Sequence, residues 1–239
     1  MSVAFAIEPL AEDALLLRFG DGIDATINAR VHAAAHSLRA VNLPGIIDIA
    51  PAYATLLVRF DASGRGGDAL SEAITRALCR RFRGSDELTA AVSGTPAAQS
   101  IEMPVCYDGE FGQDLEAVAG YARLSHGEVI ARHTAAEYTV AMLGFAPGFP
   151  YLLGLDAALH VPRRADPRTR VPAGSVAIGG AQTGIYPREL PGGWNLIGRT
   201  PLALFDPDRD PSCLLAPGDR VRFRAIDADE FAQHAEPRA

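Results

Sequence analysis

The chain has 239 residues, with 22 arginine-plus-lysine residues against 29 aspartate-plus-glutamate residues and a formal charge of -7. All the basic residues are arginines, because the sequence contains no lysine. Without lysine, the chain cannot be a Schiff-base enzyme, a covalent carrier of biotin or lipoate, or a P-loop nucleotide-binding protein. The negative charge argues against a general nucleic-acid-binding protein, so no nucleic-acid partner is expected.

The sequence also limits where the protein works. The N-terminus lacks the basic and apolar regions of a signal peptide, and no apolar run reaches the roughly 18 residues of a membrane span. The three cysteines are too widely spaced for a disulfide framework or a zinc site. We therefore expect a cytoplasmic protein that has no metal site and no membrane partner.

The first part of the chain shows the pattern of a small α+β domain. Alternating apolar and polar positions over residues 3–9 and 14–19 predict a β-hairpin. Asp24 can cap a helix that runs to about residue 41. The next elements are strands at 45–50 and 55–60, then a helix from about 68 to 82 whose apolar stripe includes Cys79. Two amphipathic helices and about four strands predict an α+β domain over residues 1–83.

A second domain is predicted after a linker at residues 84–99, which are small, polar and without apolar periodicity. A strand at 101–107 precedes a helix at 114–124 and a further helix, whose Ser125 and Glu128 have the spacing of a capping box. Short β-rich runs then alternate with glycine and proline and predict a β-barrel; they lie at 138–143, 171–180, 203–206 and 219–226. The barrel domain is predicted to span residues 100–228, followed by a tail at 229–239.

Residues 144–201 hold 18 of the 40 glycines and prolines of the chain, and such constrained loops often carry function. Six arginines and two acidic residues lie between positions 163 and 199, giving a local charge of +4 that would attract anions. Arg163, Arg164 and Arg168 fit a solvated loop equally well. Arg170 and Arg199 lie beside glycine- and proline-rich segments and are therefore the stronger candidates for anion binding.

Three other features of the sequence are candidates for a site. The segment GGAQTGIYP places Gln182, Thr183 and Tyr186 among glycines that let a ligand approach the backbone, although a tight turn fits the same pattern. Trp194 follows two glycines and fits either a stacking wall for a ligand or a plug of the barrel. His133 is the histidine best suited to acid–base chemistry, and a structural role fits it equally well.

Three segments carry a family resemblance: EYTVAMLGFAPGFPYLLGL, PRRADPRTRVPAGSVAIGGAQTGIYPRELPGGWNLIGRTPLALFDP and LLAPGDRVRF. They closely resemble the family of bacterial 5-oxoprolinase B subunits, also called the KipI-like or allophanate hydrolase subunit 1 family. The resemblance implies an α+β N-terminal domain followed by a cyclophilin-like β-barrel domain. It also implies a protein that works with a homologous C subunit and an A subunit to convert 5-oxo-L-proline, ATP and water to L-glutamate, ADP and phosphate.

Two other activities of this family are alternatives for the chain. Related modules form the carboxyltransferase part of urea carboxylase, and one relative inhibits a sporulation histidine kinase. Three functions on one scaffold mean that the family alone does not fix the reaction. ATP is expected as a co-substrate that a partner protein mainly binds, since this chain has no P-loop lysine. No covalent biotin is expected on this chain, because biotin is attached to lysine.

The family-like motifs lead to specific predictions for site residues. The predicted catalytic residues are His133 as a proton carrier, with Gln182 and Tyr186 as the groups that orient the lactam. The residues predicted to bind the substrate or another anion are Arg170, Arg199, Thr183, Trp194 and Asn195. The sequence departs from the family pattern at Leu190, where a small hydroxyl residue is expected, and at Leu153, where glycine is more usual.

Overall fold

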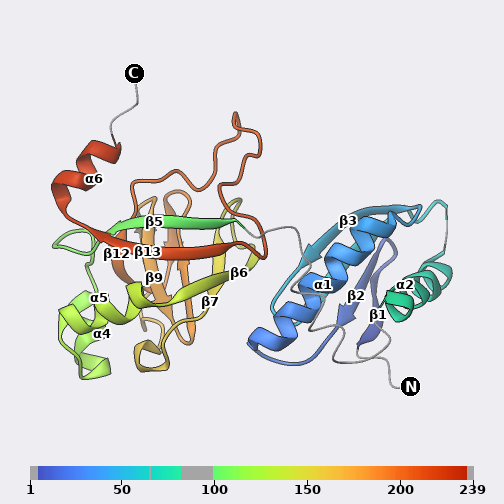
Figure 1. The fold of residues 1–239 in the computed structure, drawn as a ribbon, viewed down its shortest axis with the longest axis horizontal. Helices are drawn as coiled ribbons and strands as arrows, with labels where there is room; N and C mark the ends of the chain where they lie inside the picture. The colour runs from blue at the N-terminus through green and yellow to red at the C-terminus, as the bar shows by residue number, and fades with distance from the viewer. Residues whose placement is uncertain (1–4, 65, 82–98, 236–239) are drawn as a thin grey trace. The chain divides into compact units, whose positions relative to one another are not determined.

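The computed structural model of the chain describes residues 5–64, 66–81 and 99–235 (Figure 1). The contacts within it divide the chain into two compact units, Met1–Ala98 and Gln99–Ala239. The predicted linker at 84–99 lies outside the described residues except for its last residue.

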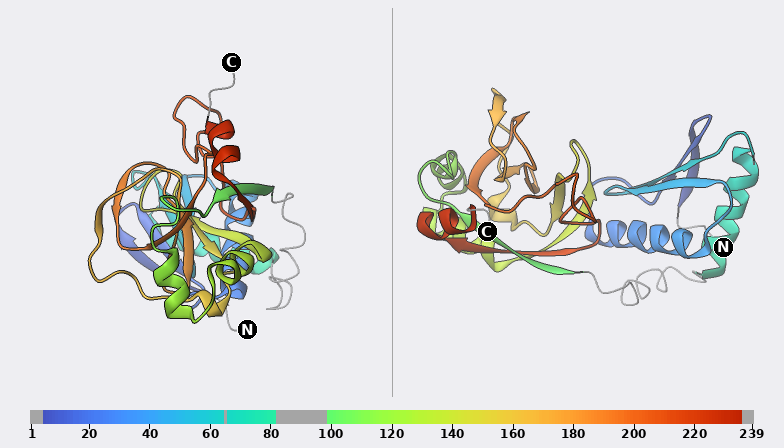
Figure 2. Two further views of the ribbon diagram at one scale, coloured as in Figure 1. Left: turned by 90° about the vertical axis from the view of Figure 1, so that its left-hand side faces the viewer. Right: turned by 90° about the horizontal axis from the view of Figure 1, so that it is seen from above.

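The N-terminal unit is a four-stranded antiparallel sheet with the strand order β1-β2-β4-β3. The strands are β1 (Ala6–Ala11), β2 (Ala14–Arg18), β3 (Ile46–Pro51) and β4 (Thr55–Phe60). The helices are α1 (Ala25–Val41) and α2 (Gly67–Arg81), and they pack against one face of the sheet (Figures 1 and 2). As predicted, the Asp24 side chain caps α1 by accepting a hydrogen bond from the Ile27 N–H at 2.8 Å.

The core of this unit follows from the alternation of its strands. Leu15 and Leu17 of β2 point to the helices, as do Leu56 and Val58 of β4, because side chains two apart share a face. The prediction that Cys79 lies on the buried stripe of α2 was wrong. Cys79 is exposed, because the buried stripe of that helix runs through Leu70, Ile74 and Leu78.

The C-terminal unit contains a closed barrel of strands in the order β10-β7-β6-β13-β5-β12-β9. The strands are β5 (Ser100–Cys106), β6 (Glu137–Leu143), β7 (Pro150–Leu153), β9 (Ser175–Gly179), β10 (Gln182–Ile185), β12 (Asn195–Arg199) and β13 (Arg220–Ile226). The first and last of these, β5 and β13, lie side by side and parallel, with Ile101 opposite Val221 (Figure 1). The β-barrel predicted from the sequence is therefore confirmed.

Shorter elements complete this unit. They are α4 (Leu115–Ala122), α5 (His126–Ala135), the 3-10 turn η2 (Ala157–Leu159), the ribbon of β8 (Arg168–Val171) and β11 (Leu190–Gly192), and α6 (Ala228–Ala235). The capping box of Ser125 and Glu128 forms at the start of α5, as predicted. Residues 203–206 form only an isolated bridge from Phe205 to Cys213 instead of a strand. The predicted tail begins inside α6.

Two apolar clusters form on opposite faces of the barrel strands. The interior cluster takes residues from all of the barrel strands, including Val105, Val176 and Phe223, so it fills the barrel. The aromatic cluster consists of Ala146, Phe149, Val171, Ala177, Tyr186, Trp194 and Leu196. Ala177 lies between Val176 and Ile178 of the interior cluster, so it points outward, and the aromatic cluster packs on the outer face of β9 and β12.

Within the described part of the chain, no helix is long and apolar enough to cross a membrane.

Candidate functional site

A pocket with a volume of about 240 Å³ opens beside the aromatic cluster. Its lining residues are Phe145, Phe149, Tyr151, Arg163, Arg164, Pro167, Tyr186, Pro191, Gly192, Gly193 and Trp194. A concave site with aromatic walls and a few polar groups is typical of small-molecule binding. All of these residues come from the glycine- and proline-rich stretch that the sequence singled out, so this pocket is the candidate functional site.

Aromatic rings in edge-to-face contact form the walls of this pocket. The ring centroid of Phe149 lies 5.2 Å from that of Tyr186 and 5.8 Å from that of Trp194, with interplanar angles of 89° and 81°. Tyr151 contacts Trp194 in the same way, at 5.9 Å. Such contacts stabilise the rings in fixed orientations, because the positive edge of one ring faces the negative face of the next. The pocket therefore has rigid walls.

Two glycines make room for these rings. A Cβ atom on Gly179 would lie 2.7 Å from three atoms of the Trp194 ring, and one on Gly192 would collide with the Tyr186 hydroxyl. Real Cβ atoms essentially never approach so closely. These two glycines of the motifs thus serve to seat Trp194 and Tyr186. Leu190, the departure from the family pattern, packs against the aromatic cluster as well.

Arg163 brings a positive charge to the pocket. Its guanidinium carbon lies 5.6 Å from the centroid of the Trp194 ring, a cation–π contact. Among the residues that the structure describes, Arg163 forms no ion pair, whereas its neighbour Arg164 and nearby Arg168 both bind Asp114. A loop that is merely solvated therefore does not account for these three arginines, because each makes a specific contact with Asp114 or Trp194.

Asp114 is a buried carboxylate that holds two arginines. Its oxygens accept hydrogen bonds from Arg164 at 2.8 Å and from Arg168 at 2.7 and 2.9 Å. They also accept one from the Leu196 N–H at 2.8 Å. Burial favours the neutral acid, but these hydrogen bonds and the two positive charges outweigh it, so the pKa of Asp114 is lowered. Asp114 is therefore ionised at neutral pH.

Two residues predicted from the sequence, Tyr186 and Trp194, lie on the pocket. Both are nearly fully buried, and burial raises the pKa of the Tyr186 hydroxyl, although a hydrogen bond from the Trp194 backbone acts in the opposite direction. Tyr186 therefore stays protonated at neutral pH and can act as a hydrogen-bond donor.

His133 and Thr183 lie together in the barrel core, away from the pocket lining. His133 Nδ1 is 2.8 Å from the Tyr107 hydroxyl, its Nε2 is 3.4 Å from Thr183 Oγ1, and its ring stacks on Phe223. Complete burial lowers the pKa of His133 to about 3. An imidazole that stays neutral at pH 7 is poorly matched to carrying protons. The geometry supports the structural alternative for His133.

Asn195 and Arg199 lie on β12, outside the pocket lining. The Asn195 side chain donates hydrogen bonds to the carbonyl oxygens of Pro162 at 2.9 Å and Ile178 at 3.3 Å, so it connects the loop before Arg163 to the barrel. The Arg199 guanidinium carbon lies 5.4 Å from the centroid of the Phe111 ring, and its buried Nε has no hydrogen-bond partner among the described residues.

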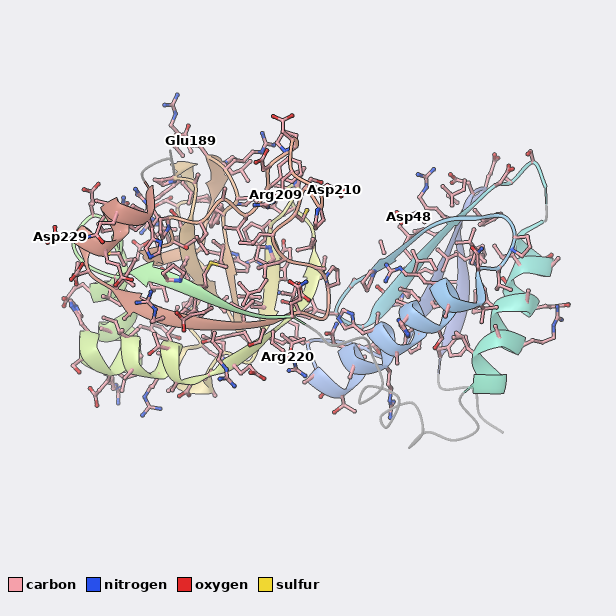
Figure 3. The ribbon with its side chains drawn as sticks, turned by 45° about the horizontal axis from the view of Figure 1, so that its top comes forward. Asp48, Glu189, Arg209, Asp210, Arg220 and Asp229 are labelled. Carbon is pink, nitrogen blue, oxygen red and sulfur yellow. The ribbon has the colours of Figure 1, made fainter. Side chains whose placement is uncertain are left out.

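Arg170 and Gln182 also lie outside the pocket lining. Arg170 is 81% exposed and its Nε is 3.5 Å from Glu189, which projects from the edge of the unit (Figure 3). Gln182 is the first residue of β10 and is partly buried. The structure therefore does not gather the predicted site residues into one site, and it leaves the roles predicted for Arg170, Arg199 and Gln182 as predictions.

Sequence reasoning missed Asp114 and gave Arg163 no specific role. Asp114 is separated by 50 residues from Arg164 and by 54 from Arg168, and no local pattern marks such a contact. The excess of arginines between positions 163 and 199 is the feature of the sequence that could have indicated Asp114, because a buried carboxylate often pairs with arginines.

A larger hollow of about 630 Å³ lies between β1 and α2 in the N-terminal unit. Its rim carries Glu12, Asp68 and Glu72 against one arginine, Arg76, so its charge would repel an anionic substrate. No cluster of three or more metal-ligating side chains occurs in the described ranges. The pocket of the barrel unit is thus the better candidate for an anion.

Comparison with known proteins agrees with the fold and with the family resemblance. Residues 5–215 match the family described as carboxyltransferase domain, subdomain C and D. The B subunit of the 5-oxoprolinase of Bacillus subtilis (strain 168) is 43% identical over 238 residues, which cover 99% of each chain.

Solved structures show the same relationship. The crystal structure of TTHA0988 is 40% identical with a TM-score of 0.74, and the match covers 90% of this chain but 40% of that chain. The present chain therefore spans less than half the length of TTHA0988. The Kluyveromyces lactis urea amidolyase, 21% identical with a TM-score of 0.70, shares the fold over 96% of this chain and 15% of its own.

Proposed function

The chain belongs to the carboxyltransferase domain C and D family, and we propose that it is the B subunit of an ATP-dependent 5-oxoprolinase. The observation that carries this proposal is the 43% identity, over 99% of both chains, to a protein with that name. A pocket that combines aromatic walls with a guanidinium supports it, since 5-oxo-L-proline is a small ring that bears a carboxylate.

The proposed reaction opens the lactam ring of 5-oxo-L-proline. ATP transfers its terminal phosphoryl group to the lactam oxygen, which converts that oxygen into a leaving group. One water then attacks the activated carbon and the C–N bond of the ring breaks, which leaves an acyl phosphate on the opened chain. A second water hydrolyses this acyl phosphate, so that L-glutamate and phosphate are released together with ADP. In this scheme, Tyr186 donates a hydrogen bond that orients the lactam, and Trp194 forms the wall against which the ring packs.

The proposal assigns the remaining components to other proteins. ATP is bound mainly by a partner, because a chain without lysine has no P-loop. The partners are a homologous C subunit, which binds this chain directly, and an A subunit. The closed barrel supports a cyclophilin-like class for the C-terminal unit. The free thiols of Cys79, Cys106 and Cys213 support a reducing, cytoplasmic setting.

A carboxyltransferase component of a urea-carboxylase system is the second candidate. The description of the matching family and the fold shared with the urea amidolyase favour it. Such a system would need biotin on another chain, because biotin is attached to lysine and this sequence has none.

Reconstitution of the complex tests the proposed function. The purified chain is mixed with homologues of the A and C subunits, 5-oxo-L-proline and ATP, and the release of glutamate and phosphate is followed. We expect equal amounts of both products from the complete mixture and none when this chain is omitted. A mixture that is inactive with 5-oxo-L-proline, or equally active without this chain, would refute the proposal. Copurification with a biotinylated protein would favour the carboxyltransferase component, and copurification with a histidine kinase would favour the alternative that the chain inhibits such a kinase.

A further inference from the structure

We propose that Arg163 binds the carboxylate of the substrate and that Asp114 is the positioning residue that holds Arg163 over Trp194. This inference rests on the proposed 5-oxoprolinase function for the identity of the substrate. It differs from the sequence-based prediction, which gave the anion to Arg170 and Arg199.

The charges around the pocket single out Arg163. Two arginines line it, Arg163 and Arg164, and the guanidinium of Arg164 already donates to the buried carboxylate of Asp114. In the part of the chain that the structure describes, Arg163 has no carboxylate partner. One guanidinium that is free to bind an anion, set among aromatic walls, fits a carboxylate better than a phosphate group of higher charge.

The contact with Trp194 orients the Arg163 side chain for binding. The guanidinium carbon of Arg163 lies 5.6 Å from the centroid of the Trp194 ring. A guanidinium that packs on an indole through its face keeps the N–H groups at its edge available. Those N–H groups form a planar fork that matches both oxygens of a carboxylate. The ring of a bound lactam would then lie among the aromatic walls while its carboxylate meets the guanidinium.

The backbone on both sides of Arg163 is anchored. Before it, the carbonyl oxygen of Pro162 accepts a hydrogen bond from Asn195 at 2.9 Å. After it, the Arg164 N–H donates to the Gly193 carbonyl at 2.8 Å, and the Arg164 side chain binds Asp114.

Asp114 fixes the far end of the same loop as well, because it binds both Nη atoms of Arg168. The Asp114 side chain is 5% exposed, so these bonds are shielded from water and hold the loop firmly. Asp114, at the start of α4, therefore acts together with Asn195 and the Gly193 carbonyl to position the loop that presents Arg163.

A general electrostatic effect of Asp114 predicts the opposite result from a positioning role. Removing its negative charge would strengthen the binding of an anion if only the total charge mattered. If Asp114 positions Arg163, removing the charge weakens that binding. Glu189 offers a matched control, because it is an acidic residue in the same unit that pairs with Arg170 and is 59% exposed.

The test uses the fluorescence of Trp194, the only tryptophan of the chain, as a reporter of the pocket. The full chain is titrated with 5-oxo-L-proline, with its uncharged analogue 2-pyrrolidinone, and with inorganic phosphate. We expect the wild-type emission to respond to 5-oxo-L-proline at lower concentration than to either of the other two. R163Q should weaken 5-oxo-L-proline binding about tenfold or more and leave 2-pyrrolidinone binding within about twofold.

D114N should weaken 5-oxo-L-proline binding about threefold or more, while E189Q leaves it unchanged or slightly stronger. If D114N does not fold, R168K tests the same positioning role, because it keeps the positive charge and loses the paired hydrogen bonds that Arg168 donates to Asp114. The proposal is overturned if wild type gives no response, if R163Q binds like wild type, or if D114N and E189Q both strengthen binding. Because the titration needs no turnover, a loss of binding in R163Q stands even if the reconstituted complex is inactive.

Discussion

Replacing Gly179 with alanine tests how the aromatic pocket is built. The added Cβ would lie 2.7 Å from Cδ1, Cγ and Nε1 of the Trp194 ring. The backbone at Gly179 is held in β9 of the barrel, so the Trp194 ring must shift instead. That shift is costly, because Trp194 packs against Phe149 and Tyr151. We therefore expect the ring to move, and the pocket to lose the wall that Trp194 forms.

The expected cost can be worked out from the same contacts. Overpacking a well-filled site costs about 1–3 kcal/mol, and the lower entropy of an unfolded chain with alanine returns about 0.4–1 kcal/mol. At the middle of these ranges, the net loss in the free energy of unfolding is about 1.3 kcal/mol, which lowers the melting temperature by roughly 3–5 °C. Urea denaturation and thermal denaturation measure these quantities, and the emission of Trp194 reports the displacement of the ring.

Gly193→Ala is the matched control. A Cβ on Gly193 would lie 3.5 Å from the nearest atom of Pro167, an ordinary contact, so we expect a change within about 0.5 kcal/mol. Equal stability of G179A and the wild type, with unchanged Trp194 emission, would refute the reasoning that Gly179 exists to seat the tryptophan.

Three further predictions follow from the buried and exposed polar groups. The pKa of His133 is about 3 in the folded protein and near 6.5 when unfolded, so stability is lost as the pH falls below 6.5, by up to about 1.4 kcal/mol per unit. His133→Phe should reduce this slope between pH 7 and pH 5 in urea denaturation, and an unchanged slope would contradict the assignment. Asn195→Ala leaves the Pro162 and Ile178 carbonyls without their donor and should cost about 1–3 kcal/mol in the same assay. Arg170→Ala removes an exposed ion pair and should cost at most about 0.5 kcal/mol, so a loss above 1 kcal/mol would count against its exposed placement.

The helix caps and most of the barrel strands could be predicted from the sequence, because they are determined by residues close together in the chain. The caps of α1 and α5, formed by Asp24 and Ser125, follow from hydrogen bonds within one turn of helix. The β-runs of the barrel follow from alternation and from turn residues. The run at 203–206 failed because a strand also needs a neighbouring strand to pair with, and only Phe205 finds a partner.

The site was harder to predict than the fold, because it depends on which face of each strand points inward. Thr183 and Tyr186 belong to one short motif, yet Thr183 contacts His133 in the barrel core and Tyr186 lies on the outer pocket. The composition of the motif marked the right stretch of chain and could not separate these two faces. The contact between Asp114 and Arg164 depends on the closed barrel and therefore becomes visible in three dimensions alone.

The Michaelis constant of the reconstituted complex for 5-oxo-L-proline tests most directly whether this chain supplies the substrate site. It is measured at saturating ATP with wild type, with R163Q, and with G127A as a control, whose added Cβ in α5 would meet no atom within 4 Å. We predict that R163Q raises this constant about tenfold or more and leaves that for ATP within about twofold, while G127A behaves like the wild type. Wild-type kinetics in R163Q would contradict the account, because the substrate would then bind elsewhere.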